Sequence, residues 1–373
     1  MNLSKEIRAL AKANKGNLYG FFYEGKYRLN NDLKSLKPHQ LNTLNLLSIE
    51  SPFELCRLVK TPFYILEKLI NEPVYKHYSI EKKKGGFREI CAPAKRLKKT
   101  QRSLNYFLQA YYLWIKPNAV HGFVINPGYL NVYCNIAENA RVHVGKKHVL
   151  NIDLKDFFPS ISARRVKALF QSECFGFDEQ MATALTLLAT FEGKLPIGAP
   201  SSPVISNFIC LQLDKELIEF CAANDLSFSR YADDLTFSSD SVIIQDEILD
   251  IINIIQKNNF KINGKKLYLR ASNQRQVVTG LTVNEKVNID RKLLKQIRAM
   301  IHDLHVNGLE VAAQKHFNIP FESSEAAQLK FFDRLSGYIN FVGQIRGKED
   351  LLFQKLTNNL IEAVRANSRK LQR

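Results

Sequence analysis

Two adjacent aspartates, Asp233 and Asp234, lie between two short strand-like runs at residues 228–232 and 235–237. The simplest local structure is a β-hairpin with both carboxylates at its tip. Neighbouring carboxylates in a tight turn repel each other, and a bound divalent cation is the usual way to keep both ionised. Aspartate is also common in ordinary polar turns. The pair alone therefore leaves a metal site and a plain turn as alternatives.

A third carboxylate, Asp153, interrupts the apolar run at residues 149–154, which has the pattern of a buried strand. Burial of a carboxylate is costly unless it is paired or bound to a metal. Helices are expected between Asp153 and the hairpin, separated at residues 193–203 by a loop of glycine, proline and small residues that a ligand can approach closely. The order strand, helix, helix, hairpin predicts an α+β fold with a split βαβ arrangement and antiparallel strands backed by helices. We expect this fold to bring the three carboxylates together around two divalent cations about 4 Å apart, the geometry for in-line phosphoryl transfer.

The charge of the chain points to a polyanionic partner. Lysine and arginine number 53 and aspartate and glutamate 36, which gives a net charge of +17. Such an excess favours nucleic acid as the partner. Ten basic and two acidic residues lie between Lys76 and Arg102, on two expected strands, the Gly85-Gly86 turn between them, and the start of a helix. We expect phosphate or nucleic-acid contact there.

Other features limit the alternatives. The six cysteines are scattered without a Cys-x-x-Cys pair, which argues against a zinc site and for reduced thiols in the cytoplasm. No apolar run approaches the length of a membrane-spanning helix, and the first residues are not those of a signal peptide. We therefore expect a cytoplasmic protein with no membrane partner. Four regions are expected: helical at 1–75, basic strands and loops at 76–147, the α+β region at 148–284, and basic helices at 285–373.

In combination, these motifs resemble those of reverse transcriptases. The Tyr-Ala-Asp-Asp run at 231–234 matches the family's Tyr-x-Asp-Asp box, and Asp153 matches its first aspartate. Residues 195–203 match the loop and helix that cradle the nascent base pair. The resemblance covers about residues 75–285 and implies a right-hand polymerase, an RNA-directed DNA polymerase and nucleotidyltransferase. Residues 76–147 would be its fingers, 148–284 its palm and 285–373 a helical thumb.

Two further elements resemble those of bacterial retron reverse transcriptases. Asn139 and His143 stand in an Asn-Ala-x-x-His element just before the first aspartate, and Val278, Thr279 and Gly280 form a Val-Thr-Gly element just after the palm. The family implied is therefore the retron reverse transcriptases. A defence-associated reverse transcriptase outside the retron group is the first alternative. The second is a nucleic-acid scaffold that restrains a partner effector.

The resemblance implies roles for individual residues. Asp153, Asp233 and Asp234, with the Leu154 carbonyl, would bind two Mg²⁺ ions, for which Mn²⁺ can substitute. Lys266, or its neighbour Lys265, would protonate the leaving pyrophosphate. The nucleotide would be held by Lys83, Arg88, Asp156, Phe157, Phe158, Ile197 and Gly198, with Phe158 as the gate that excludes a ribose 2′-OH. Ile197 departs from the family, which usually has glutamine there, and the consequence of that change is left open.

The resemblance also implies partners. Retron enzymes use a cognate structured non-coding RNA as template, prime from a 2′-OH in it, and make a branched RNA–DNA product (msDNA) that serves antiphage defence with a separate effector protein. We expect dNTPs as substrates and leave a higher-order complex open. Nucleic-acid contacts are expected at Asn139, His143, Val278, Thr279, Gly280, Lys292, Lys295 and Arg298. The sequence does not identify the RNA, its branching guanosine or the effector.

Overall fold

A computed structural model describes residues 3–25, 28–82, 85–130, 133–317 and 324–371. The chain divides into two compact units, one of residues 1–135 with 150–268 and one of residues 136–149 with 269–373. The expected boundaries of the fingers, palm and thumb stay predictions. Residues 136–149 and 269–284 are thus grouped with the C-terminal helices.

The predicted helical character of the first 75 residues is confirmed. These helices are α1 (Leu3–Ala13), α2 (Lys15–Tyr23), α3 (Asn31–Lys34), α4 (Pro38–Leu47), α5 (Pro52–Leu58) and α6 (Phe63–Asn71). The predicted basic hairpin follows as β1 (Tyr75–Glu81) and β2 (Phe87–Pro93), antiparallel from Tyr75↔Pro93 to Glu81↔Phe87. At the start of β1, the Tyr75 ring stacks on Phe191 with centroids 4.2 Å apart.

The described part of the first unit contains six further helices. They are α7 (Lys95–Ile115), α9 (Ala163–Gln171), α10 (Glu179–Ala189), α11 (Ser202–Ile209), α12 (Leu211–Ala223) and α13 (Gln245–Lys257). Side-chain caps begin two of them: Ser162 Oγ accepts from the Arg165 amide at 3.3 Å, and Asp178 Oδ1 from the Met181 amide at 2.8 Å. Tyr111 and Phe208 pack with ring centroids 5.3 Å apart in the core beneath them.

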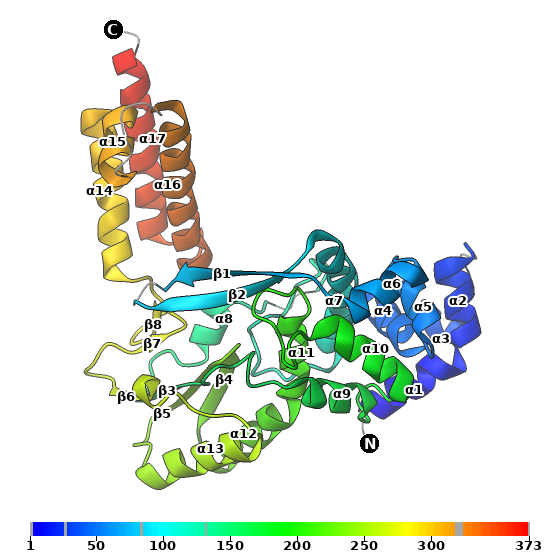
Figure 1. Ribbon diagram of the computed structural model, residues 1–373. Coiled ribbons are helices and arrows are strands. Elements are labelled where there is room, and N and C mark those ends of the chain that lie inside the picture. Colours follow the sequence, from blue (N-terminus) through cyan, green and yellow to red (C-terminus); the bar gives the residue numbers. More distant parts are fainter. Residues whose placement is uncertain (1–2, 26–27, 83–84, 131–132, 318–323, 372–373) are drawn as a thin grey trace. The chain divides into compact units, whose positions relative to one another are not determined.

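The central sheet has the strand order β4-β5-β3-β6, formed by β3 (His148–Asp153), β4 (Ser227–Tyr231), β5 (Asp234–Ser239) and β6 (Tyr268–Ala271). Strands β4 and β5 are antiparallel and directly consecutive. Helices α12 and α13 run below β3, β4 and β5 in Figure 1, and α12 contacts both β4 and α13. The sheet therefore confirms the predicted α+β class, with the end of β3 brought beside the β4–β5 turn.

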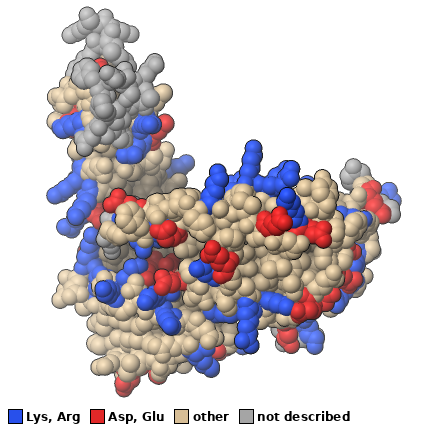
Figure 2. All heavy atoms as spheres, in the orientation of Figure 1, with Lys and Arg blue, Asp and Glu red and all other residues tan. Residues whose placement is uncertain are grey.

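The second unit has its own apolar core, in which α14 (Arg291–Asn307), α15 (Leu309–Phe317), α16 (Ser324–Arg346) and α17 (Leu351–Leu371) pack together. Helix α8 (Ile136–Arg141) packs against the small hairpin of β7 (Val277–Val278) and β8 (Leu281–Thr282). In Figure 1, α14 lies at the left edge of the helical bundle, and Figure 2 shows basic side chains along that edge. In the described part of the chain, no helix is both long and apolar enough to cross a membrane.

Candidate active site

The turn between β4 and β5 carries the aspartate pair, but its tip differs from the prediction by one residue. Tyr231 pairs with Asp234, so the two turn residues are Ala232 and Asp233, and Asp234 is the first residue of β5. Ala232 has φ of +61°, the left-handed conformation that a two-residue hairpin turn requires. Asp233 is half-buried and Asp234 exposed. The two carboxylates therefore have different surroundings although they are adjacent in sequence.

Asp153 ends β3 and meets this turn. Its side chain is buried, with 7% of the residue exposed. The Leu154 amide donates to the Asp233 carbonyl at 3.0 Å, and the Asn263 amide donates to the Asp153 carbonyl at 2.8 Å. These backbone bonds hold the end of β3 between the aspartate turn and the segment before Lys266, so the expected approach of Asp153 and Asp233 is observed.

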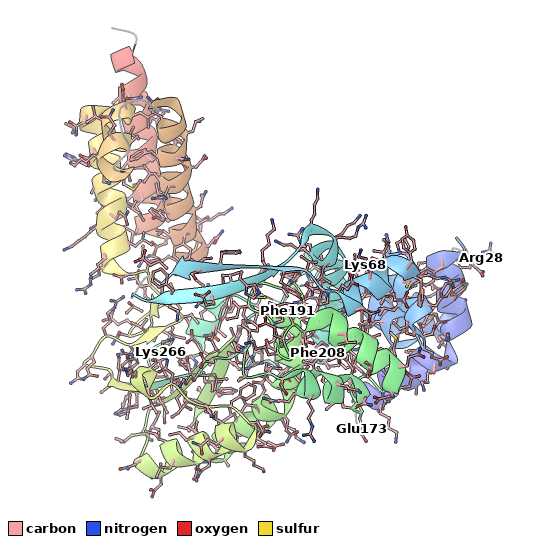
Figure 3. The ribbon with its side chains drawn as sticks, viewed as in Figure 1. Arg28, Lys68, Glu173, Phe191, Phe208 and Lys266 are labelled. Atoms are coloured by element: carbon pink, nitrogen blue, oxygen red, sulfur yellow. The ribbon has the colours of Figure 1, made fainter. Side chains whose placement is uncertain are left out.

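Lys266 supplies a positive charge at Asp153. Its Nζ lies 2.5 Å from Asp153 Oδ1, while Asn263 Nδ2 donates to Asp153 Oδ2 at 3.2 Å. Both carboxylate oxygens of this buried aspartate are thus satisfied, as burial demands. Lys266 is half-exposed at the edge of the site (Figure 3). Of the two lysines that the sequence offers as general acid, Lys266 is the one that contacts an aspartate of the motif.

The electrostatics of the site follow from these contacts. Burial raises the pKa of Asp233, and the charge of Asp153 raises it further, against the opposing effect of Lys266 and Arg88. Partial burial lowers the pKa of Lys266, but the hydrogen bond to Asp153 and the charges of all three aspartates outweigh this and raise it. Lys266 is therefore an ammonium at neutral pH.

The donor set fits a hard divalent cation, although the three carboxylates are not assembled as one ligand group. Across the described residues, no group of three or more His, Cys, Asp or Glu side chains is placed to hold a metal ion. The convergence expected of Asp153, Asp233 and Asp234 is thus realised for Asp153 and Asp233, with Asp234 beside them on β5. Carboxylate oxygens are the donors that Mg²⁺ prefers.

The segment after Asp153 carries the predicted nucleotide contacts. Asp156 is exposed with φ of +48°, and Phe157 is buried. Phe158 is half-buried, with its ring centroid 5.3 Å from that of Phe157 and 5.7 Å from that of Phe123. Phe158 is therefore supported by two aromatic neighbours, as a rigid steric gate requires, and its role as a gate stays a prediction.

The loop before α11 is attached to the basic hairpin. The Cys91 amide donates to the Ile197 carbonyl at 2.7 Å. Gly198 has φ of +119° and lies so close to β2 that an added Cβ would be 3.0 Å from Ile90 Cγ2. Arg88, exposed on β2, acts electrostatically on Asp233. The nucleotide contacts predicted for Arg88, Ile197 and Gly198 thus fall on connected segments, while Lys83 lies outside the described residues.

The two retron-like elements pack against each other in the second unit. Asn139, His143 and Val278 are buried, and Thr279 Oγ1 donates to the Ile136 carbonyl at 3.1 Å. Their burial favours a packing role over direct contact with RNA. Gly280 is exposed, as are Lys292, Lys295 and Arg298 on α14. The RNA contacts of these exposed residues stay predictions.

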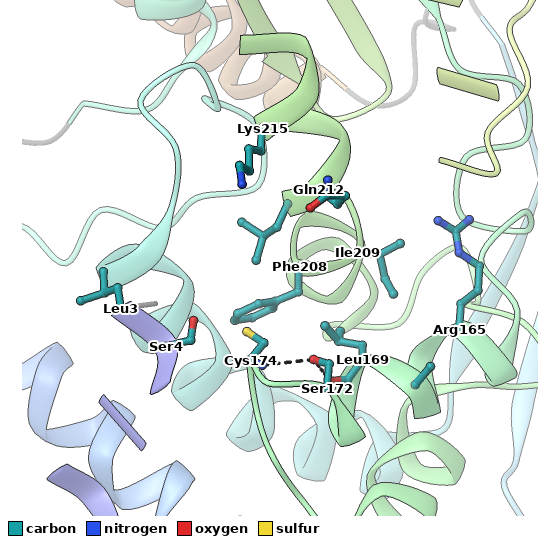
Figure 4. Close-up of a pocket in the computed structure, with 12 residues that line it drawn as sticks. Leu3, Ser4, Arg165, Leu169, Ser172, Cys174, Phe208, Ile209, Gln212 and Lys215 are labelled. Carbon is teal, nitrogen blue, oxygen red and sulfur yellow. Dashed lines mark hydrogen bonds between the residues drawn. The ribbon is translucent and has the colours of Figure 1, made fainter. Parts of the chain in front are cut away.

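A groove of about 850 Å³ lies elsewhere, between the start of α1 and helices α9, α11 and α12. Its lining includes Leu3, Arg165, Cys174, Phe208 and Lys215 (Figure 4), and none of the three aspartates. The groove is therefore separate from the aspartate site.

Sequence reasoning missed the buried polar residues behind the aspartate turn. Arg230 is fully buried, with Nε 2.6 Å from Asp214 Oδ1 and Nη2 2.7 Å from Asp214 Oδ2. Burial lowers the pKa of Arg230, but the Asp214 carboxylate raises it above its usual range. Burial raises the pKa of Asp214, against the opposing charge and hydrogen bonds of Arg230. The available signal was an arginine at an inward position of β4, between Phe228 and Ala232.

Known protein families and relatives were compared with this chain. The family model described as reverse transcriptase (RNA-dependent DNA polymerase) matches residues 80–283, more than half of the chain. The Retron Ec86 reverse transcriptase of Escherichia coli is 34% identical over 236 residues, which cover 62% of this chain and 70% of that protein. The Retron Mx65 reverse transcriptase of Myxococcus xanthus is 34% identical over 247 residues, which cover 61% of this chain and 55% of that protein.

Among solved structures, a telomerase from Candida albicans in complex with a fragment of telomeric RNA matches with a TM-score of 0.43 and 11% identity, covering 81% of this chain and 62% of that one. A similarity of this extent carries no argument about function. The range of the family model, residues 80–283, contains all three aspartates.

Proposed function

The chain belongs to the reverse transcriptases, or RNA-dependent DNA polymerases, and among them to the bacterial retron group; from this premise we propose that it copies a cognate structured non-coding RNA into DNA. Synthesis starts from a 2′-OH of that RNA and leaves a branched RNA–DNA molecule, msDNA. The complex acts in antiphage defence together with a separately encoded effector. The observation that carries the catalytic part is the cluster of Asp153, Asp233 and Lys266 at the end of β3.

Asp153 and Asp233 bind Mg²⁺ in this proposal, with Asp234 and the Leu154 carbonyl as further ligands. When bound, two such ions lower the pKa of the attacking hydroxyl and neutralise the charge that develops on the phosphates. The primer hydroxyl attacks the α-phosphorus of the dNTP, and pyrophosphate leaves. The aspartates orient these groups, and Arg88 offsets the charge of the triphosphate.

Lys266 protonates the leaving pyrophosphate. Its raised pKa keeps it in the ammonium form that a general acid requires, and its half-exposed side chain can move from Asp153 towards the phosphates. Phe158, held between Phe157 and Phe123, selects deoxyribonucleotides by clashing with a ribose 2′-OH.

The polymerase activity is tested by primer extension on an RNA template with dNTPs and Mg²⁺. We expect Asp233→Asn to abolish extension, because the amide keeps the shape but not the charge that binds the cation. Asp250→Asn is the matched control, because Asp250 is exposed on α13. Extension by the Asp233 variant at the wild-type rate would refute the assignment of the site.

The retron product is tested by the nucleic acid that purifies with the protein. We expect DNA that resists RNase, is lost on DNase treatment and carries a branched RNA end. A linear product, or none in the presence of active enzyme, would exclude the retron product. Phage protection by the double variant Asp233→Ala, Asp234→Ala, in the absence of any DNA, would instead favour a scaffold that restrains the effector.

Recognition of the RNA is assigned to α14. Lys292, Lys295 and Arg298 are exposed on one helix whose opposite face packs in the core of the second unit. We expect each of the three side chains to contact RNA phosphates. Replacing one of them by alanine should therefore weaken RNA binding. It should also make the slope of log K against log salt concentration shallower by about one unit or less. If the variant with all three residues replaced by alanine kept the wild-type salt dependence, the RNA would not bind at these residues.

A further inference from the structure

A chain of buried polar contacts lies directly behind the aspartate turn. The Arg230 guanidinium binds both oxygens of Asp214 and uses its remaining nitrogen, Nη1, for two more bonds. One goes to Asn207 Oδ1 at 3.0 Å and the other to the Ala232 carbonyl at 3.1 Å. Ala232 immediately precedes Asp233, so the arginine holds the backbone that presents the half-buried aspartate.

Asn207 and Arg230 also contact residues 119–122. Asn207 Nδ2 donates to the Gly122 carbonyl at 3.0 Å. The Arg230 amide donates to the Ala119 carbonyl at 2.9 Å, and the His121 amide donates to the Arg230 carbonyl at 3.0 Å. Residues 119–122 thus pair with β4 at Arg230 and brace the turn from behind.

Stability alone does not explain a fully buried ion pair at this position. The cost of removing both charges from water is comparable to the attraction between them, and apolar residues of similar volume often serve stability as well or better. What an apolar pair cannot do is donate a hydrogen bond to the Ala232 carbonyl. An arginine fork can bind a carboxylate with two nitrogens and still reach a third acceptor in a fixed direction.

We propose that Arg230, oriented by Asp214 and Asn207, is a positioning residue of the polymerase: it fixes the Ala232 carbonyl and thereby the place of Asp233 relative to Asp153. The front of the turn is held by the Leu154 amide on the Asp233 carbonyl, and the back by Arg230 on the Ala232 carbonyl. The two hydrogen bonds thus fix the carbonyls of consecutive residues, Ala232 and Asp233. Asp233 is thus located against the end of β3 without depending on a bound metal.

The proposal rests on the polymerase activity proposed above, and its test uses a preparation whose wild-type activity is measured in the same assay. Inactive wild-type protein would refute the proposed function. Active wild-type protein with equally active variants would refute the positioning role.

Arg230→Lys retains one positive charge opposite Asp214 but lacks the two-nitrogen fork of the guanidinium. We expect kcat for single-nucleotide incorporation to fall about 100-fold, as for a displacement of about 1 Å. The Mg²⁺ concentration for half-maximal rate should rise, while the affinity for primer–template is unchanged.

The second unit offers a matched control. Arg346 binds both oxygens of Asp350 at 2.8 Å and Asn288 Oδ1 at 2.9 Å through the same three nitrogens. Arg346→Lys therefore removes the same kind of fork in a unit that holds none of the three aspartates. We expect it to lower the melting temperature and to leave kcat and the Mg²⁺ requirement unchanged.

Two further variants keep the test decisive if Arg230→Lys does not fold. The double variant Arg230→Met, Asp214→Leu replaces the whole ion pair by apolar side chains, and Asn207→Ala leaves the ion pair intact but removes its anchor. For either one, folded protein with a reduced kcat and a raised Mg²⁺ requirement supports the proposal. Folded protein with wild-type kcat and Mg²⁺ dependence overturns it.

Discussion

Gly122 offers the sharpest single perturbation of the aspartate turn. A Cβ added at Gly122 would lie 2.3 Å from the Ala232 nitrogen and 2.9 Å from the Tyr231 carbonyl carbon. Real Cβ contacts essentially never fall below 3.0 Å, so Gly122→Ala forces a separation of about 0.7 Å at the backbone of the turn. The obstructing atoms are main chain, which cannot rotate away as a side chain can.

We expect this displacement to act on catalysis more than on folding. A misplacement of about 1 Å in an active site can reduce the rate about 100-fold, so a shift of this size is expected to cost at least about tenfold in kcat. The assay is incorporation of one dNTP on an RNA template at saturating Mg²⁺, with the melting temperature measured in parallel.

The matched control is Gly16→Ala. Gly16 is exposed in α2, and a Cβ there meets nothing within 4 Å. Gly16 is the second residue of α2, where alanine favours the helix more than glycine does, so this variant should melt at or slightly above the wild-type temperature and have wild-type activity. A Gly122→Ala protein that folds and incorporates nucleotide at the wild-type rate would refute the close support of the turn.

Other predictions concern the groups at the site itself. Lys266→Met should reduce kcat by about 10²–10⁴-fold through loss of the general acid, whereas Lys265→Met should have little effect in the same single-turnover assay. Loss of the Lys266 charge should also raise the pKa of Asp233 further, so the acidic limb of the pH–rate profile moves to higher pH; a move to lower pH would contradict the electrostatic account. Phe158→Ala should increase ribonucleotide incorporation relative to dNTP incorporation, measured as the ratio of the two kcat/KM values. Arg88→Ala should raise KM for dNTP more than it lowers kcat, and an unchanged KM would place the triphosphate away from β2.

The sequence predicted the chemistry of the site. Three aspartates in the order strand, helices, hairpin predicted a phosphoryl-transfer centre, and the Tyr-Ala-Asp-Asp run resembled the family that the comparisons confirm. The α+β class and the helical ends followed from the same patterns. These features can be predicted because they depend on residue type and on short-range periodicity, both of which are present in the sequence itself.

Only the tertiary structure decided which of several neighbouring residues lies at a given point. It placed Lys266 and not Lys265 against Asp153, it moved Asp234 from the tip of the turn into β5, and it buried Asn139 and His143 in the second unit. The place of Asp234 depends on the register of the hairpin, where a change of one residue reverses the side on which a side chain lies. Lys266 is placed by the short 3-10 helix Gly264–Lys266, and Asn139 by the packing of α8 against the β7–β8 hairpin.

The support behind the turn was also decided by packing. Arg230 meets Asp214 and Asn207 across 16 and 23 residues of sequence, and Gly122 meets Asn207 across 85. No local pattern encodes such contacts, because they arise when α11, α12 and β4 close around the same buried volume. The sequence therefore identified the aspartates, while the fold determined what holds them in place.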